Sequence, residues 1–183
     1  VAHSMLNQIR NNPQLMRLIY SATADDLNNI HSMYLLQNYA EASSWLDSAY
    51  IYNAKEGLVI YTYNDGSDYV LTFKQLESFY DKDILLELCD VQESVELPLL
   101  RNVTRSTEEE NKSLFTYYIP VRNSSSKCDG CFVVNINPSR LMELSYGFTG
   151  DRDRQIIIAD SPENYYVDSE YLLDKETQQA VLN

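Results

Sequence analysis

Tyrosine, threonine and asparagine side chains recur at alternate positions of several strand-like segments. Because side chains alternate between the two faces of a strand, these residues are predicted to share one face of a sheet. They are Tyr50, Tyr52, Tyr61, Tyr63, Thr116, Tyr118 and Asn135. Aromatic walls with a few hydroxyl and amide groups suit a small-molecule pocket. The same tyrosines could equally be amphipathic sheet residues whose hydroxyls reach the rim.

Arg101 follows the segment Pro98-Leu99-Leu100 and is predicted to lie at the mouth of such a pocket. A guanidinium group there could bind a carboxylate of a ligand through two parallel hydrogen bonds. An ion pair with a nearby Asp or Glu is an equally good interpretation in so acidic a chain.

The sequence lacks the motifs of common catalytic sites. There is no nucleophile elbow, phosphate-binding glycine loop, dinucleotide fingerprint or His-Glu-x-x-His pair. His3 and His31 both lie in the N-terminal helical region, and the carboxylate pairs Asp81/Asp83 and Asp151/Asp153 suit a helix start and a solvated loop. We therefore expect no enzyme, no metal site and no cofactor.

Three cysteines are too few and too unevenly spaced for a disulfide scaffold. Cys128 and Cys131 have the spacing of a redox pair, but they precede a strand-like run and not a helix, which is where such thiolates are activated. They could be two small turn residues or a local disulfide in an oxidising compartment. Cys89 is interpreted as a small buried hydrophobe.

The first forty or so residues are predicted to be helical, with a break at Asn12-Pro13 because Asn caps and Pro begins helices. Apolar and aromatic residues then recur every three or four positions, as on one long helix or two consecutive ones. They are Met16, Tyr20, Thr23, Leu27, Ile30 and Tyr34. Such a series could pack on the domain or form a coiled-coil-like dimer interface.

The remaining segments predict an antiparallel sheet. Two hairpins are expected, one from residues 45–53 and 58–63 and the other from residues 114–121 and 131–137. Further strands are expected after Arg101 and at 155–160, and a short helix is expected from Pro138. Residues 73–91 have helical spacing. The apolar face of this sheet should meet the helices; its residues are Ala49, Ile51, Leu58, Ile60, Phe115, Tyr117, Ile119, Phe132, Val134 and Ile136. The fold class is α+β.

Charge and hydropathy narrow the class of protein. The 183 residues include 14 Lys plus Arg and 27 Asp plus Glu, which gives a net charge of −13. A surface of this charge repels phosphate groups, so direct nucleic-acid binding is not expected. No run approaches the roughly 18 to 20 apolar residues that cross a bilayer. The chain begins at Val1, as a piece excised from a longer protein would.

Several segments together resemble a double Cache sensor domain, also called a PAS-like PDC domain. They are Leu46–Asn53, Ser113–Val121, and Gly130–Asn137 followed by Leu141, and Ile156–Asp160 resembles the first strand of a second module. The variety is that of Gram-positive AraC-type regulators and sensor histidine kinases. The amino-acid-binding signature, a Tyr followed at a distance by Arg-x-Trp-Tyr, is absent because the only tryptophan is Trp45.

The resemblance implies a long N-terminal helix packed on a PAS-like sheet, with a helical region at 1–44, a sensor module at 45–148 and a truncated or reduced membrane-proximal module from 149 to 183. It implies an extracytoplasmic domain of a membrane-anchored signalling protein that binds a small molecule. The ligand-binding residues it implies are Tyr52, Tyr61, Arg101, Tyr118 and Asn135. A homodimer through the N-terminal helix is a possible partner arrangement. The alternative function is a protein-interaction or dimerisation module with Met16, Leu27 and Ile30 at the interface.

Overall fold

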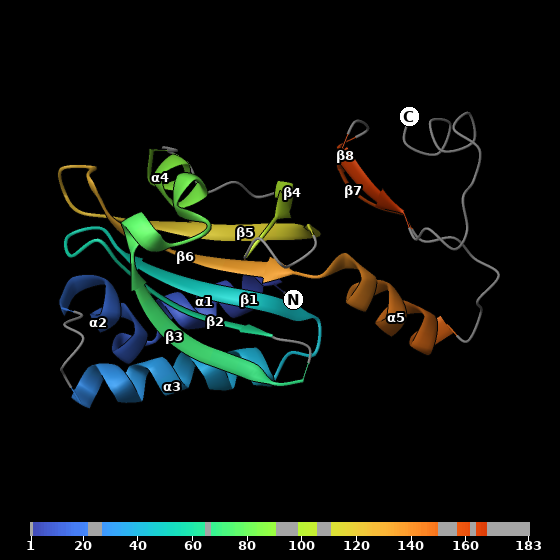
Figure 1. Ribbon diagram of the computed structural model, residues 1–183, viewed down its shortest axis with the longest axis horizontal. Coiled ribbons are helices and arrows are strands. Elements are labelled where there is room, and N and C mark those ends of the chain that lie inside the picture. The colour runs from blue at the N-terminus through green and yellow to red at the C-terminus, as the bar shows by residue number, and fades with distance from the viewer. Residues whose placement is uncertain are drawn as a thin grey trace.

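The computed structural model describes residues 2–21, 27–64, 67–90, 99–105, 111–149, 157–161 and 164–167. The main body is one antiparallel sheet of six strands in the order β3-β2-β1-β6-β5-β4, which confirms the predicted α+β class. The strands are β1 (Leu46–Asn53), β2 (Leu58–Asn64), β3 (Tyr69–Gln75), β4 (Leu99–Val103), β5 (Lys112–Arg122) and β6 (Cys128–Ile136). Three helices cover one face, and a 3-10 helix with a fourth α-helix covers the other (Figure 1).

The N-terminal region is divided into separate helices and is not the one long helix implied by the family resemblance. These helices are α1 (Ala2–Asn11), α2 (Pro13–Ser21) and α3 (Leu27–Glu41). The break at Asn12-Pro13 is confirmed, since Asn12 Oδ1 accepts hydrogen bonds from the backbone N–H groups of Gln14 and Leu15 at 2.9 and 3.4 Å. This is the geometry of an N-cap.

The predicted series of residues is not the buried face of α2, although its Met16 packs against the edge of the core. Tyr20 and Tyr34 are 48% and 56% exposed, whereas Leu15, Leu18 and Ile19 of α2 are buried. Thr23 lies outside the described residues, and so do the side chains of Leu27 and Ile30. The packing face of α2 is therefore rotated from the predicted one by about one residue position.

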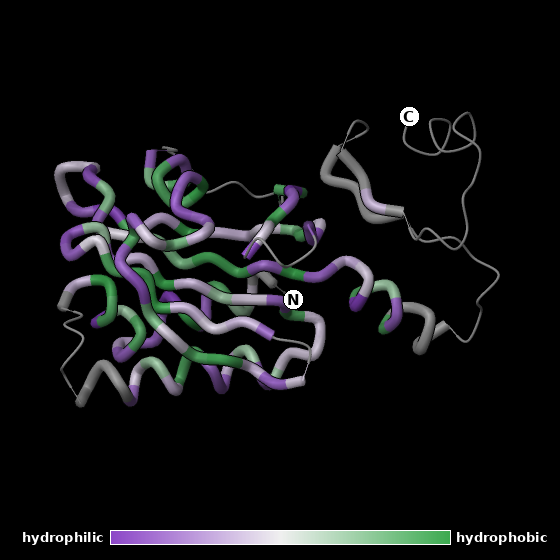
Figure 2. Tube along the Cα trace, in the orientation of Figure 1, coloured by the Kyte–Doolittle hydropathy of each residue, from purple (hydrophilic) through white to green (hydrophobic). Residues whose placement is uncertain are grey.

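The sheet has the two faces that side-chain alternation predicts. Apolar residues of β1, β2, β5 and β6 pack with α1, α2 and α3 in one core, whose largest fully buried rings are Phe115 and Phe132. Figure 2 shows the hydrophobic run of β6 at the centre of the sheet. Gly130 allows β6 to approach β1 here, because a Cβ at this position would lie 2.0 Å from the carbonyl oxygen of Tyr52.

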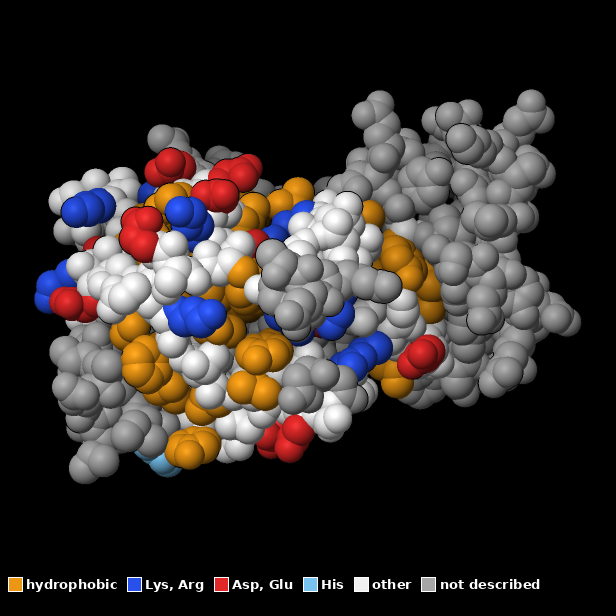
Figure 3. Space-filling view, in the orientation of Figure 1, with side chains coloured by type: hydrophobic (Ala, Val, Ile, Leu, Met, Phe, Trp, Pro, Cys, Tyr) orange, Lys and Arg blue, Asp and Glu red, His pale blue; other side chains and the backbone are white. Residues whose placement is uncertain are grey.

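The prediction of a helix over residues 73–91 is wrong in its first half. Tyr69–Gln75 forms the edge strand β3, followed by the 3-10 helix η1 (Leu76–Ser78) and by α4 (Lys82–Asp90). The helical spacing of the apolar residues arose because Leu76, Phe79, Leu85 and Leu88 all bury against the same sheet face from different elements. Figure 3 shows hydrophobic side chains on the surface over the β3 edge of the sheet.

The chain leaves the sheet through α5 (Pro138–Thr149), which begins at the predicted proline, and enters a hairpin of β7 (Ile157–Ser161) and β8 (Asn164–Val167). Ser139 Oγ and Tyr166 Oη form a hydrogen bond of 2.5 Å between α5 and this hairpin. Asp151 and Asp153 lie outside the described residues. In the described part of the chain, no helix has both the length and the hydropathy to span a bilayer.

Phe132→Ala should lower the free energy of unfolding by about 3–5 kcal/mol, because it leaves a cavity in the core beneath the helices. The matched change Phe73→Ala removes a ring that is 44% exposed, against 1% for Phe132, and should cost less than about 1 kcal/mol. Urea unfolding of both variants measures the difference. Equal losses would contradict the placement of Phe132 in the closed core, since both rings belong to the helix-covered face and differ in burial.

Candidate functional site

The five residues implied by the family resemblance all belong to the sheet face that lies away from α1, α2 and α3. Tyr52, Tyr61 and Tyr118 are buried in the second core with η1 and α4. Thr116 and Asn135 are direct partners across β5 and β6, and Arg101 of β4 reaches both of them. We call the part of this face around Arg101, Thr116 and Asn135 the Arg101 site.

All three guanidinium nitrogens of Arg101 are engaged with protein groups. Its Nη1 and Nη2 donate to the two carboxylate oxygens of Asp81 at 2.7 and 2.6 Å. Its Nε donates to Thr116 Oγ1 at 2.6 Å, and Nη2 also lies 3.3 Å from Asn135 Oδ1. The interpretation of Arg101 as the partner of a nearby acid is therefore confirmed.

This ion pair is largely shielded from solvent, since the side chains of Arg101 and Asp81 are 13% and 10% exposed. Burial opposes the charge of Arg101, but hydrogen bonds from Arg101 to Asp81 and the carboxylate charge outweigh it and raise the pKa of the guanidinium. Arg101 is thus a fixed cation, and Asp81 neutralises it with a bidentate geometry that a ligand carboxylate could also adopt.

Hydrogen bonds extend from the Arg101 site across the sheet. Asn135 Oδ1 accepts from Thr116 Oγ1 at 2.7 Å, and Asn135 Nδ2 donates to Ser48 Oγ at 3.0 Å. Ser48 Oγ donates to Tyr50 Oη at 3.3 Å, which leaves the Tyr50 proton free to point to Tyr80 Oη, 2.6 Å away. One chain of donors and acceptors thereby connects β4 to the segment before α4.

Aromatic rings fill the space beside this network. Phe79 packs on Tyr50, Tyr61 and Tyr80 with ring centroids 5.1, 4.9 and 4.5 Å apart. Burial, the main cause, raises the pKa of Tyr50 and Tyr80, so both hydroxyls stay protonated at neutral pH. The protein's own residues 79–81 therefore occupy the face on which the family resemblance places a ligand.

A second buried cation, Arg105, follows β4. It forms an ion pair with Asp47 and donates to the carbonyl oxygen of Asn64 at 3.1 Å. Its guanidinium carbon lies 4.9 Å from the centre of the Tyr63 ring, a cation–π contact. Sequence reasoning missed this cluster because no local motif links Asp47 to a residue 58 positions away.

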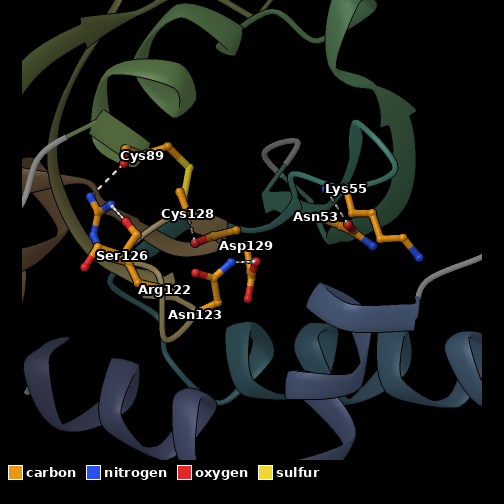
Figure 4. Close-up of a disulfide and its surroundings, with 9 residues drawn as sticks. Asn53, Lys55, Cys89, Arg122, Asn123, Ser126, Cys128 and Asp129 are labelled. Atoms are coloured by element: carbon orange, nitrogen blue, oxygen red, sulfur yellow. Dashed lines mark hydrogen bonds between the residues drawn. A yellow bond between two sulfur atoms is a disulfide. The ribbon is translucent and has the colours of Figure 1, made fainter.

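The cysteines pair differently from the sequence-based interpretation. Cys89 of α4 and Cys128 of β6 form a disulfide across 39 residues, with Cα atoms 5.5 Å apart (Figure 4). Cys131, the expected local partner of Cys128, is a free and fully buried thiol. The idea that Cys89 is only a small hydrophobe is therefore wrong, although the residue is buried. A cavity of about 570 Å³ lies beside this disulfide, and Tyr52 lines it.

No protein-family model and no curated protein sequence matches the chain. Matches are found among solved structures. A domain of a sensory box/GGDEF family protein from Vibrio parahaemolyticus aligns with a TM-score of 0.59 at 9% identity, over 78% of this chain and 54% of that one. The extracellular domain of a protein assigned as a histidine kinase gives the same score and identity, over 78% and 52%.

The ligand-binding domain of the Campylobacter jejuni chemoreceptor Tlp3, in complex with 4-methylisoleucine, aligns with a TM-score of 0.55 at 14% identity, over 94% of this chain and 62% of that one. The chain has the fold of a sensory domain. The chain spans only about half to three-fifths of the length of those matched structures.

Alkylation should distinguish the three cysteines. Burial raises the pKa of Cys131 from 9.0 to about 12, so its neutral thiol favours the folded state below pH 9, and that contribution is lost as the pH rises toward 12. At pH 8, iodoacetamide should label no cysteine of the folded protein, Cys131 alone in urea, and all three in urea with a reductant. Mass spectrometry counts the labels, and labelling of Cys89 or Cys128 without reductant would disprove the pairing.

Proposed function

We propose that the chain is the extracytoplasmic sensing domain of a bacterial transmembrane signalling protein, either a transcriptional regulator or a histidine kinase. A small molecule binds at the Arg101 site, with Arg101 for an anionic group, Asn135 for a polar group, and Tyr52, Tyr61 and Tyr118 as walls. The helices α1, α2 and α3 on the opposite face pass the signal to the output domain. The sensor module spans residues 45–148, after a helical region at 1–44, and residues 149–183 begin a second module.

The observation that carries the proposal is the buried arginine at the Arg101 site in a chain with a sensory-domain fold. A carboxylate ligand would take the place of Asp81 on the guanidinium group, because both present two oxygens to the same pair of nitrogens. Release of Asp81 would free the segment of Phe79 and Tyr80 from the sheet. Ligand binding would then favour a second conformation only by its higher affinity for that conformation.

The relay has a physical path in the strands themselves. β1 and β6 place side chains in the core with the helices and, at alternate positions, in the core with η1 and α4. A shift of β1 or β6 caused by repacking on one face therefore also moves the side chains that these strands place in the core on the other face. Chemoreceptor Tlp3, whose fold the chain shares, binds amino-acid ligands in its sensory domain, which makes amino acids and organic acids the first compounds to test.

A second function is favoured by the exposed rings on the helices. Tyr20 of α2 and Tyr34 of α3 are both about half exposed. A protein-interaction or dimerisation module would bury them against a partner and would need no pocket. In that case Met16, Leu27 and Ile30 belong to the same interface.

A melting-temperature screen against organic acids, amino acids, sugars and short peptides tests the proposal. A ligand at a hundred times its Kd stabilises the folded state by about 2.7 kcal/mol, or roughly 5–10 °C for a chain of this size. Arg101→Lys keeps the charge but loses the planar fork, so it should abolish most of that rise. Arg10→Lys, on the exposed surface of α1, should leave it intact.

The same data separate the two functions. A melting temperature that rises with protein concentration, with no shift from any compound, would favour the dimerisation module and overturn the small-molecule site. A ligand whose effect survives Arg101→Lys would place binding elsewhere on the domain.

A further inference from the structure

The disulfide between Cys89 and Cys128 forms part of the wall of a solvent-open cavity. The cavity has a volume of about 570 Å³ and lies where the last turn of α4 meets the hairpin between β5 and β6. Tyr52 and Leu86 also line it. A disulfide in the wall of such a cavity can be approached by a small molecule from solvent, unlike one enclosed in a core.

The charge of the cavity wall is opposite in sign to that of the whole chain. Arg122 and Lys127 line it together with one acid, Asp90, while the net charge of the protein is −13. Arg122 is fixed beside the disulfide, because Nη1 donates to the carbonyl oxygen of Ser126 at 2.9 Å and Nη2 to that of Cys89 at 2.7 Å (Figure 4). Lys127 is exposed and directly precedes Cys128.

The disulfide is also a covalent crosslink between α4 and β6 of the sheet. Two other kinds of contact hold α4 on the sheet. Leu85 and Leu88 are buried, and Arg122 donates a hydrogen bond to the carbonyl oxygen of Cys89. Cleavage of the bond would leave the nine-residue helix on these contacts and on the ion pair between the preceding residue, Asp81, and Arg101. An isolated helix of that length is unstable in water.

We propose that this cavity admits a small anionic thiol that reduces the disulfide, so that Cys89 and Cys128 act as a redox latch on α4. The thiolate attacks Cys128 Sγ, the more exposed of the two cysteines, and Cys89 leaves as a thiolate that takes a proton from solvent. A second thiolate attacks the mixed disulfide, which releases the oxidised small thiol and the Cys128 thiolate, itself then protonated. Two electrons pass from the two small thiols to the protein disulfide.

The anionic preference follows from the cations in the wall, since they lower the energy of an approaching negative charge. The net charge of the whole protein, −13, would by itself favour a cationic thiol, so a preference for the anionic thiol must come from the cavity wall. The latch does not depend on a ligand at the Arg101 site. It acts on the same helix, which follows Asp81 directly along the chain.

The test compares three thiols, namely 2-mercaptoethanesulfonate, 2-mercaptoethanol and cysteamine, which are anionic, neutral and cationic. Loss of the disulfide is followed by alkylation and mass spectrometry at low ionic strength. Each rate is divided by the rate of the same thiol with hydroxyethyl disulfide, which is uncharged, to remove differences in thiol pKa and nucleophilicity.

The corrected rate for the sulfonate should exceed that for cysteamine by roughly sevenfold, as expected for thiols that differ by two unit charges near one net unit charge about 7 Å away in water. Lys127→Gln should remove this preference, and Lys74→Gln, which removes the same charge from β3, should retain it. After reduction, amide hydrogen exchange should accelerate in residues 82–90 and stay unchanged in β1.

Three results would overturn the proposal. They are a corrected rate that is equal or higher for the cationic thiol, a preference for the anionic thiol that persists in Lys127→Gln, and unchanged exchange in α4 after complete reduction. The last result would show that the disulfide is only a staple between elements that hold together without it.

Discussion

The burial of the Arg101 guanidinium on a sheet face is the constraint on which the arrangement of this side of the protein depends. A buried charge is tolerated only when it is paired and its hydrogen-bonding groups are satisfied. Asp81 supplies the opposite charge, and Thr116 and Asn135 supply further oxygens at 2.6 and 3.3 Å. Because Asp81 lies between η1 and α4, this pairing fixes the whole segment over the sheet.

The two faces of the sheet are therefore closed by different physical interactions. Helices α1, α2 and α3 cover one face through apolar contacts, which have no preferred direction. The other face is closed by apolar and aromatic contacts of η1 and α4 and, in addition, by a directional network that runs from Arg101 through Asn135, Ser48 and Tyr50 to Tyr80. A competing carboxylate or a changed disulfide could release such a closure without unfolding the apolar core.

Much of the fold could be predicted from the sequence because it depends on local patterns. Alternation assigned the strand residues to the correct faces, and Asn12-Pro13 correctly marked a helix boundary. Pairings over long sequence distances could not be predicted. Asp81 resembled a helix-start charge, although it pairs with a residue 20 positions away, and Cys128 had a nearer cysteine than its true partner. The five candidate residues were placed on one face, but the sequence did not show that residues 79–81 cover it.

A double-mutant cycle between Arg101 and Asp81 tests most directly whether this ion pair closes the face. Asp81→Asn and Arg101→Gln each leave a buried charge without its partner and should each cost about 3–5 kcal/mol in urea unfolding. The double variant should lose at least about 2 kcal/mol less than the sum of the two, because neither charge remains. Additive losses would show that the two residues do not interact, and would contradict the account of the Arg101 site as a face held closed by Asp81.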